Sequence, residues 1–230
     1  MDRVLQTKEI DEKPLIQLPE EFAIKAEKMQ ELFLYHRCAI KEIQTKLEIL
    51  NEELAFKTQR NPIESISSRV KSPKSIIEKL QRKKLPLTID SIWDNLNDVA
   101  GVRVVCSFLE DIYDVADMFM RQDDIEVLEV KDYIKNPKPN GYRSLHLIVV
   151  VPIFLSEKTL PMRVEVQIRT IAMDFWASLE HQVKYKKGVP NAERISAELK
   201  ECAESISEND RKMQEIYHEI HKMSKITESY

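Results

Sequence analysis

The sequence has little glycine, with three residues among 230, at positions 101, 141 and 188. It contains no Gly-x-Gly-x-x-Gly pattern and no Gly-x-x-x-x-Gly-Lys-Ser/Thr pattern. Loops of these two kinds bind phosphate because glycine lets the backbone approach it closely. The scarcity therefore excludes the common glycine-rich phosphate loops, and any nucleotide must be held by side chains and by the N-termini of helices.

Cysteines and long apolar runs are also scarce. The three cysteines, Cys38, Cys106 and Cys202, are far apart and form no Cys-x-x-Cys pair, so neither a disulfide framework nor a zinc site is expected. The N-terminus lacks the apolar segment of a signal peptide. The longest apolar run, 147–155, is far shorter than the roughly 20 residues that span a bilayer. We expect a soluble, cytoplasmic protein that binds no membrane.

Charge of neither sign dominates. The chain has 35 basic and 39 acidic side chains, which gives a formal net charge of −4. This balance argues against a general nucleic-acid coat or a polybasic membrane binder, although a local basic patch is compatible with it. A hydrophobic content of 43% over this length allows a sizeable buried core.

Apolar residues at alternating four- and three-residue steps mark both ends of the chain. This spacing predicts two long helices, each with a heptad seam on one face. The seams could pack within the chain or between subunits, and both alternatives stay open at this point. The seam residues are Met29, Phe33, His36, Ile40, Ile43, Leu47, Leu50 and Leu54 in the first helix, and Ile195, Leu199, Cys202, Ile206, Asn209, Met213, Ile216, Ile220 and Met223 in the second.

The middle of the chain reads as strands surrounded by helices. Pattern and capping signals predict an α+β fold, with a single mixed β-sheet flanked by helices. The chain is expected to divide into an N-terminal tail and helical extension at 1–60, a core at 61–190, and a C-terminal oligomerisation helix at 191–230. The expected strands are 102–108, 125–134, 144–151 and 162–170, and the expected helices of the core are 73–84, 111–121 and 171–186.

One strand alternates strictly between apolar and polar residues. Because side chains alternate between the faces of a strand, Met162, Val164, Val166 and Ile168 share one face. The opposite face carries the polar residues Arg163, Glu165, Gln167 and Arg169. This polar face is either the solvated face of an edge strand or the floor of a cleft that binds an anion.

A basic segment begins before the second predicted helix. Between Arg69 and Lys84 there are seven basic residues and one acidic residue. Lys71 precedes the helix, Ser75 lies in its first turn, and Lys79 lies one turn further on. Backbone amides, a hydroxyl and ammonium groups arranged in this way suit a polyphosphate. A solvated helix and a patch for RNA phosphates are the alternatives.

Two further segments combine a bend with chemically active side chains. Asp98 precedes Gly101 and a strand, which suits a magnesium ligand or a simple turn cap. The second segment, 138–146, contains a Pro-Asn-Gly turn that presents Tyr142, Arg143 and His146. An aromatic ring there can stack on a base, and the cations can bind phosphate, whereas the alternative is an ordinary surface turn.

These segments, in this order, resemble the synthetase domain of the RelA/SpoT alarmone enzymes over roughly residues 60–190. The chain is most similar in layout to the small alarmone synthetases of the RelP and RelQ type, and more to the RelP type. No His-Asp dipeptide occurs and no room remains for a hydrolase domain, so hydrolysis of the product is not expected. The matching segments are Arg69-Val70-Lys71 with Ser75, Asp98 to Arg103, Lys131 to Ile134, Pro137 to His146, Glu165 to Thr170, and the helix with Trp176, Glu180-His181 and Lys184-Tyr185-Lys186.

The resemblance implies a nucleotidyltransferase-like synthetase fold and a GTP pyrophosphokinase activity. The β,γ-pyrophosphate of ATP would move to the ribose 3′-hydroxyl of GTP or GDP, and AMP would leave. Asp98 and Glu165 would hold Mg²⁺, and Glu165 would also accept the hydroxyl proton. A homotetramer that works without nucleic acid is implied as well.

The resemblance also implies roles for the substrate-binding side chains. On the ATP side, Arg69 and Arg103 would sandwich adenine, while Lys71, Ser75 and Lys79 would grip the phosphates. On the acceptor side, Tyr142 would stack on guanine, and Asn140 would read the guanine edge with help from the main chain near Ala177. The cations that would hold phosphate or ribose are Lys131, Lys138, Arg143 and His146. Gln167 would support this wall of the site.

The sequence departs from the family pattern at a few positions. Glu129 stands where many long enzymes carry Arg, which bears on metal preference or acceptor choice. Asp174 stands where related small synthetases can carry Asn. The segment 61–68 does not match the allosteric alarmone site of RelQ-like members, so no activation by product is predicted. An RNA-binding or scaffolding module without turnover, and a different nucleotidyltransferase, remain the competing hypotheses.

Overall fold

The computed structural model describes residues 20–184 and 192–227. The N-terminal tail expected before the first helix lies outside this range, as do Tyr185 and Lys186 of the segment that resembles the family. A five-stranded sheet forms the centre, in the order β1-β2-β5-β4-β3. Among the described strands only β2 and β5 pair in parallel, so the sheet is mixed and the predicted α+β class is confirmed. The strands are β1 (Ile63–Val70), β2 (Ala100–Cys106), β3 (Glu126–Asp132), β4 (Leu145–Phe154) and β5 (Thr159–Thr170).

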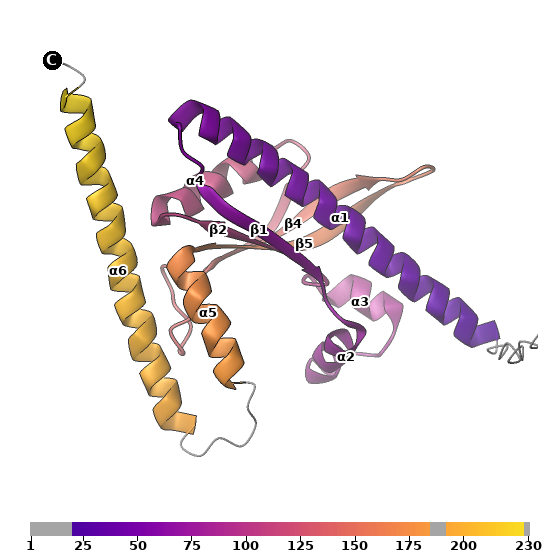
Figure 1. Cartoon of the computed structure of the whole chain (residues 1–230). Helices are drawn as coiled ribbons and strands as arrows, with labels where there is room; N and C mark the ends of the chain where they lie inside the picture. Colours follow the sequence, from indigo (N-terminus) through magenta and orange to yellow (C-terminus); the bar gives the residue numbers. More distant parts are fainter. Residues whose placement is uncertain (1–19, 185–191, 228–230) are drawn as a thin grey trace, which may run out of the picture.

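Six helices surround this sheet in the described part of the chain (Figure 1). The long helix α1 crosses one face of the sheet and α5 lies on the other side, whereas α2 and α3 pack against the N-terminal part of α1 around Leu32, and α6 runs beside α5. No described helix is both long enough and apolar enough to cross a membrane. The helices are α1 (Glu20–Thr58), α2 (Pro73–Arg82), α3 (Ile89–Asn95), α4 (Leu109–Met120), α5 (Ile171–Lys184) and α6 (Ala192–Thr227).

The alternation of β5 separates the core from the cleft. Val164, Val166 and Ile168 are fully buried and pack in one cluster with residues of α1 such as Ile43 and Leu47. Because β5 lies in the middle of the sheet, its polar face is not that of a solvated edge strand. The opposite face of the sheet is thereby left to polar side chains, which form the floor of the site.

The two predicted seams pack differently. In α1, Ile40, Ile43 and Leu47 are buried against the sheet of their own chain, so this seam packs within the chain. In α6, Ala203 is buried on the side that faces α5, whereas Met213 of the predicted seam is 56% exposed. The seam of α6 is therefore exposed to solvent at Met213 and Ile216.

Two elements were not predicted from the sequence. The edge strand β1 has the polar sequence IESISSRV, and only its first residue is buried, so it lacks the apolar alternation of a strand. The helix α3 has seven residues and is capped by Thr88, whose Oγ1 accepts a hydrogen bond from Ser91 N. Strand β4 also continues beyond its predicted end, because Pro152 faces Pro161 across the β4–β5 hairpin.

Candidate functional site

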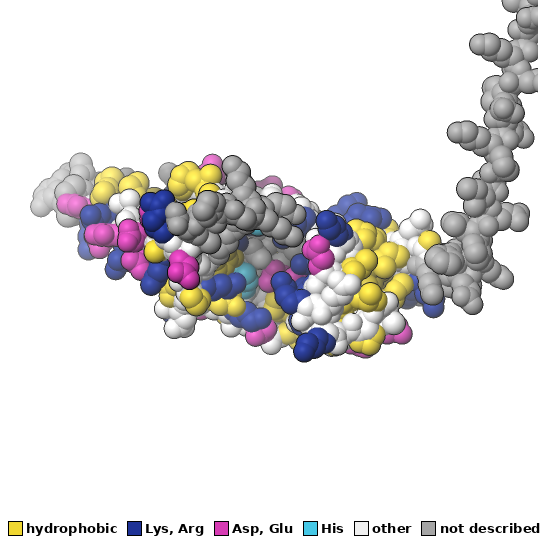
Figure 2. Space-filling model, turned by 90° about the horizontal axis from the view of Figure 1, so that it is seen from below, with side chains coloured by type: hydrophobic (Ala, Val, Ile, Leu, Met, Phe, Trp, Pro, Cys, Tyr) yellow, Lys and Arg dark blue, Asp and Glu magenta, His cyan; other side chains and the backbone are white. Residues whose placement is uncertain are grey.

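A cavity of about 200 Å³ opens on the polar face of the sheet, between β1, β2 and β5. On the face seen in Figure 2, Lys and Arg side chains lie on both sides of a hollow in which His and acidic side chains are visible. The cavity brings together predicted residues that are far apart in the sequence. Its polar lining includes Arg69, Lys71, Asp98, Arg103, Glu165 and Gln167.

Asp98 lies at the entrance to β2 and is held by two lysines. Its Oδ2 atom lies 2.8 Å from Lys71 Nζ and 2.6 Å from Lys79 Nζ, while its Oδ1 atom is buried without a hydrogen-bond partner. Burial alone would raise the pKa of Asp98, but the hydrogen bonds from the two lysines outweigh it and lower the pKa. Asp98 is therefore an ionised carboxylate with one oxygen free to bind a cation.

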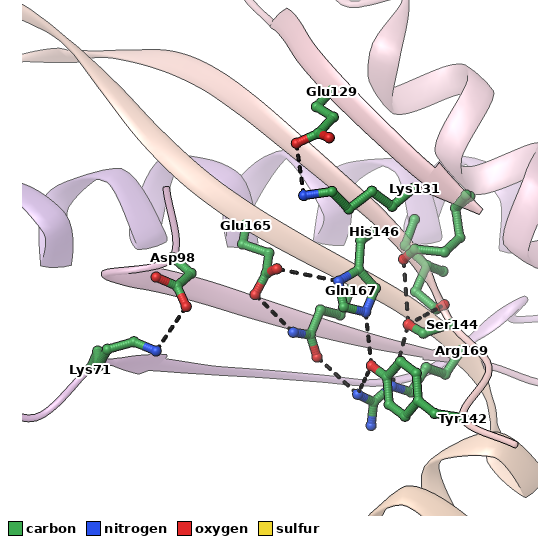
Figure 3. Close-up of polar contacts among 12 residues, drawn as sticks. Lys71, Asp98, Glu129, Lys131, Tyr142, Ser144, His146, Glu165, Gln167 and Arg169 are labelled. Carbon is green, nitrogen blue, oxygen red and sulfur yellow. Dashed lines mark hydrogen bonds and ion pairs between the residues drawn. The ribbon is translucent and has the colours of Figure 1, made fainter. Parts of the chain in front are cut away.

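Glu165 lies on β5, opposite Gly101 of β2 (Figure 3). His146 Nδ1 lies 3.2 Å from its Oε1, and Gln167 Nε2 donates to its Oε2 at 2.8 Å. Burial would raise the pKa of Glu165, but the contacts with His146 and Gln167 prevail and lower it. The side chain is thus both charged and oriented by two neighbours.

The two carboxylates fit a magnesium ion that also binds the substrate. Mg²⁺ is usually held by one or two carboxylates together with phosphate oxygens and water. Asp98 and Glu165 line the same cavity, and the partnerless Oδ1 of Asp98 is a free oxygen ligand. Among the described residues there is no group of three or more His, Cys, Asp or Glu that could hold a metal by itself. This donor set therefore suits a metal that arrives with a nucleotide.

The residues predicted for the ATP side flank the same cavity. Arg69 on β1 pairs in register with Gly101 on β2, and Arg103 follows two residues along β2. The N-terminus of α2 lies nearby in the chain, where Ser72 Oγ accepts a hydrogen bond from Ser75 N at 3.3 Å. Burial lowers the pKa of Arg103, with a further contribution from the charge of Arg169.

Residues predicted for the acceptor side form a cluster of aromatic and basic side chains beside Glu165. Tyr142 Oη lies 2.8 Å from His146 Nε2, and Lys138 Nζ lies 4.7 Å from the centroid of the Tyr142 ring. Tyr133, which the sequence reasoning did not single out as a site residue, packs edge-on against His146 with ring centroids 5.1 Å apart. Its position directly after Lys131-Asp132 was the available signal.

The remaining acceptor-side residues differ in where they point. Asn140 Nδ2 donates to Glu180 Oε1 on α5 at 3.0 Å. Arg143 donates to the carbonyls of Gly141 and Ala203, so its guanidinium faces α6. These contacts leave the substrate-binding roles of Asn140 and Arg143 as predictions.

Two other acceptor-side predictions concern the rim of the site. Lys131 Nζ pairs with Glu129 Oε2 at 2.8 Å, and this hydrogen bond raises the pKa of Lys131. The departure at position 129 therefore acts on a predicted phosphate ligand. Ala177 is half-buried on α5, and its role also stays a prediction.

Arg169 and Asp174 belong to the site although neither was predicted to bind substrate. Arg169 is only 4% exposed and donates to Tyr142 Oη, Gln167 Oε1 and Asp174 Oδ1. Arg103 Nη1 also lies 3.3 Å from Asp174 Oδ1. The polar alternation of β5 was the sequence signal for Arg169, whereas nothing local marks Asp174.

Comparison with known proteins identifies relatives of the chain. Residues 68–189 match the family described as "Region found in RelA / SpoT proteins". The chain is 44% identical over 187 residues to the GTP pyrophosphokinase YwaC of Bacillus subtilis (strain 168), a match that covers 81% of this chain and 89% of that protein.

Solved structures of the small alarmone synthetase 1 from Bacillus subtilis have the same fold. The form bound to its product pppGpp is 37% identical, with a TM-score of 0.76 over 84% of this chain and 98% of that one. The form bound to AMPCPP is 35% identical, with a TM-score of 0.71 over 85% of this chain and 99% of that one.

Proposed function

The chain belongs to the RelA/SpoT family, and we propose that it is a GTP pyrophosphokinase, a small alarmone synthetase. It transfers the β,γ-pyrophosphate of ATP to the ribose 3′-hydroxyl of GTP or GDP, so that pppGpp or ppGpp and AMP are formed. The observation that carries this proposal is that Asp98 and Glu165 line one cavity together with Arg69 and Arg103. A protein that only binds RNA has no need of this arrangement.

The reaction joins the acceptor 3′-oxygen to the β-phosphorus of ATP. The bond from that phosphorus to the oxygen it shares with the α-phosphorus breaks, and AMP leaves with this oxygen. A Mg²⁺ ion held by Asp98 and Glu165 would screen the triphosphate charge. Lys71 and Lys79, which contact Asp98 in the structure, bind phosphate oxygens when ATP is present. With Ser75 at the start of α2, they hold the triphosphate in line with the hydroxyl.

Glu165 accepts the proton of the 3′-hydroxyl, directly or through a water molecule. Its lowered pKa makes it a weak base, so its contribution depends on orientation more than on basicity. His146 and Gln167 provide that orientation by contacting its two oxygens. The same carboxylate would thus hold the cation and orient the reacting hydroxyl.

The adenine nucleotide occupies the cavity, and the guanine nucleotide lies beside it, at the cluster formed by Tyr142 and His146. Arg69 and Arg103 sandwich adenine through their planar guanidinium groups. Tyr142 stacks on guanine, and Asn140 reads its edge because an amide offers both a donor and an acceptor. The groups that complete the acceptor side are the main chain at Ala177, the cations Lys131, Lys138, Arg143 and His146, and the supporting amide of Gln167.

The protein acts in the cytoplasm as a homo-oligomer, most simply a homotetramer, without nucleic acid. The support for assembly lies in α6, whose residues Met213 and Ile216 are 56% and 50% exposed. The seam of α1 is buried in its own chain, so α6 is the terminal helix left to contact another subunit. An exposed apolar stripe of this kind is typical of a contact between subunits.

The decisive experiment incubates the purified protein with ATP, GTP and Mg²⁺ and identifies the products by chromatography. Release of AMP together with pppGpp supports pyrophosphate transfer. Release of inorganic pyrophosphate would instead indicate transfer of a nucleotidyl group, and RNA binding without turnover would support the binding module. Replacing GTP by GDP in the same assay measures the acceptor preference.

A further inference from the structure

The guanidinium of Arg169 contacts four side chains, namely Tyr142, Ser144 and Gln167, which are labelled in Figure 3, and Asp174. Its Nη1 donates to Asp174 Oδ1 at 3.1 Å, and its Nη2 donates to Tyr142 Oη at 2.5 Å and to Gln167 Oε1 at 2.9 Å. Its Nε donates to Ser144 Oγ at 3.4 Å. A buried arginine with all its neighbours in fixed positions is a rigid support, because the planar fork allows few alternative arrangements.

The first consequence concerns the ring of Tyr142. The guanidinium carbon of Arg169 lies 5.0 Å from the centroid of this ring, and the hydroxyl of the same ring contacts both Arg169 and His146. The ring is therefore fixed at its hydroxyl end as well as along its side. A tyrosine on a turn would otherwise rotate about its side-chain bonds, so these contacts set the plane on which a base stacks.

The second consequence concerns Arg103, which is assigned to the ATP side. The Asp174 oxygen that accepts from Arg169 also lies 3.3 Å from Arg103 Nη1, while Arg103 Nε is buried without a partner. Besides burial, the positive charge of Arg169 lowers the pKa of Arg103, whereas the negative charge of Asp174 raises it. One carboxylate oxygen thus holds two like-charged groups at a fixed separation.

We propose that Arg169 and Asp174 are positioning residues that orient the two nucleotide-stacking side chains, Tyr142 and Arg103, with respect to each other. Neither residue needs to touch a substrate for this role. Arg169 acts on the acceptor side through the Tyr142 hydroxyl, and Asp174 acts on both sides because it contacts Arg169 and Arg103. The inference deepens the proposed function and rests on its assignment of Tyr142 to GTP and Arg103 to ATP.

The test compares Arg169→Lys, Asp174→Ala and Tyr142→Phe. Lysine keeps the charge of Arg169, but its three donors lie on a single nitrogen and cannot span the four acceptors that the planar fork contacts. Phenylalanine keeps the stacking ring but loses the hydroxyl. We expect Arg169→Lys and Tyr142→Phe each to raise the KM for GTP about 10-fold, with the KM for ATP changed less than about 2-fold, because small misplacements of binding groups are costly. Asp174→Ala should raise both KM values about 10-fold.

A double-mutant cycle provides the readout that a merely structural role would not produce. The Arg169→Lys/Tyr142→Phe double variant should be no worse for GTP than the poorer single variant, because both changes break the same contact. If the increases in the KM for GTP of the two single variants multiplied in the double variant, Arg169 would not act through the Tyr142 hydroxyl. Asp174→Asn should restore most of the loss of Asp174→Ala, since the amide oxygen still accepts from both arginines, and failure of this rescue would overturn the role of Asp174.

A control variant distinguishes loss of the Arg169 and Asp174 contacts from loss of any ion pair. Asp117→Ala removes the exposed pair with Arg121 on α4 and should leave both KM values unchanged. Direct titration of each variant with GTP and with AMPCPP measures binding independently of turnover. If the wild type makes pppGpp but Asp174→Ala binds both nucleotides normally, the positioning role of Asp174 is refuted while the proposed function stands. If the wild type releases no AMP, the proposed function fails, and titration still decides the positioning role.

Discussion

Gly141 and Ala203 lie so close together that a Cβ added at Gly141 would come within 2.6 Å of the Ala203 Cβ. Gly141 also has a φ of +88°, a backbone conformation that residues with a side chain rarely adopt. The turn that carries Tyr142 is therefore packed directly against α6. Arg143 strengthens this contact by donating to the carbonyls of both residues.

Gly141→Ala should accordingly destabilise the protein and disturb the acceptor site. The left-handed backbone alone costs about 1–2 kcal/mol for a residue with a Cβ, and the contact with Ala203 adds to it. Thermal denaturation should show a lower Tm, and the KM for GTP should rise more than the KM for ATP. Gly101→Ala is the matched control for stability, since its Cβ would meet only the carbonyl of Arg69 at 3.8 Å. Equal loss of Tm in both variants would contradict the explanation.

Asp98→Asn and Glu165→Gln should each abolish turnover, because each removes a charged oxygen ligand that faces the phosphates. We expect AMP release to fall by roughly 10²–10³-fold or more, as when a group that stabilises the transition state is lost. Circular dichroism and Tm should stay near those of the wild type, since the amides keep the shape of the acids. If either variant retained near wild-type rates, that residue would not be part of the catalytic pair.

Tyr142→Ala should weaken binding of the guanine nucleotide far more than binding of ATP. Stacking of a base on an aromatic ring contributes about 1–3 kcal/mol, so the Kd for GTP should rise between several-fold and about 100-fold. Titration calorimetry with GTP and with AMPCPP compares the two sides directly. Tyr133→Ala is a useful second variant, because this ring packs against His146 and lies beside Tyr142. Equal losses for both nucleotides in Tyr142→Ala would refute its placement on the acceptor side.

The fold and the floor of the site were predictable because both follow local patterns. The alternation of β5 identified which residues face the core and which face the cleft, and the structure places them so. Strand β1 was missed because an exposed edge strand does not need apolar alternation, and it satisfies its backbone by pairing with β2. The link between Arg103, Asp174 and Arg169 was also missed, since it depends on α5 packing below the ends of β2 and β5.

Asp210 gives a stability prediction with a definite pH dependence. It is buried on α6 and accepts a hydrogen bond from Thr170 Oγ1. Burial raises its pKa, and the Thr170 hydrogen bond only partly opposes this effect. The folded protein therefore holds the Asp210 proton to a higher pH than the unfolded chain does, so the stability contribution of Asp210 falls as pH rises through this range. At pH 7 the charged carboxylate costs stability.

Asp210→Asn should remove this cost while its amide oxygen still accepts from Thr170. We expect the free energy of unfolding at pH 7 to rise by about 1 kcal/mol or less, which corresponds to a Tm increase of about 2–4 °C at most. The difference from the wild type should shrink when melting is measured near pH 4. Glu208→Gln, on the exposed side of the same helix, should change Tm little at either pH. A destabilised Asp210→Asn at pH 7 would contradict the argument.

Ile216 on α6 tests the proposed assembly. Its side chain is 50% exposed, and Met213, one turn before it, is 56% exposed, so a subunit contact would bury both. Ile216→Lys places a charge in that contact, and burying an unpaired charge is strongly unfavourable. Light scattering after gel filtration should show the wild type as an oligomer and the variant shifted to a smaller mass, with Tm in the monomeric form unchanged. Glu215→Lys, an adjacent exposed position off the apolar stripe, should keep the oligomer. A monomeric wild type would overturn the assembly, whereas dissociation in both variants would show that net charge, and not the apolar stripe, controls it.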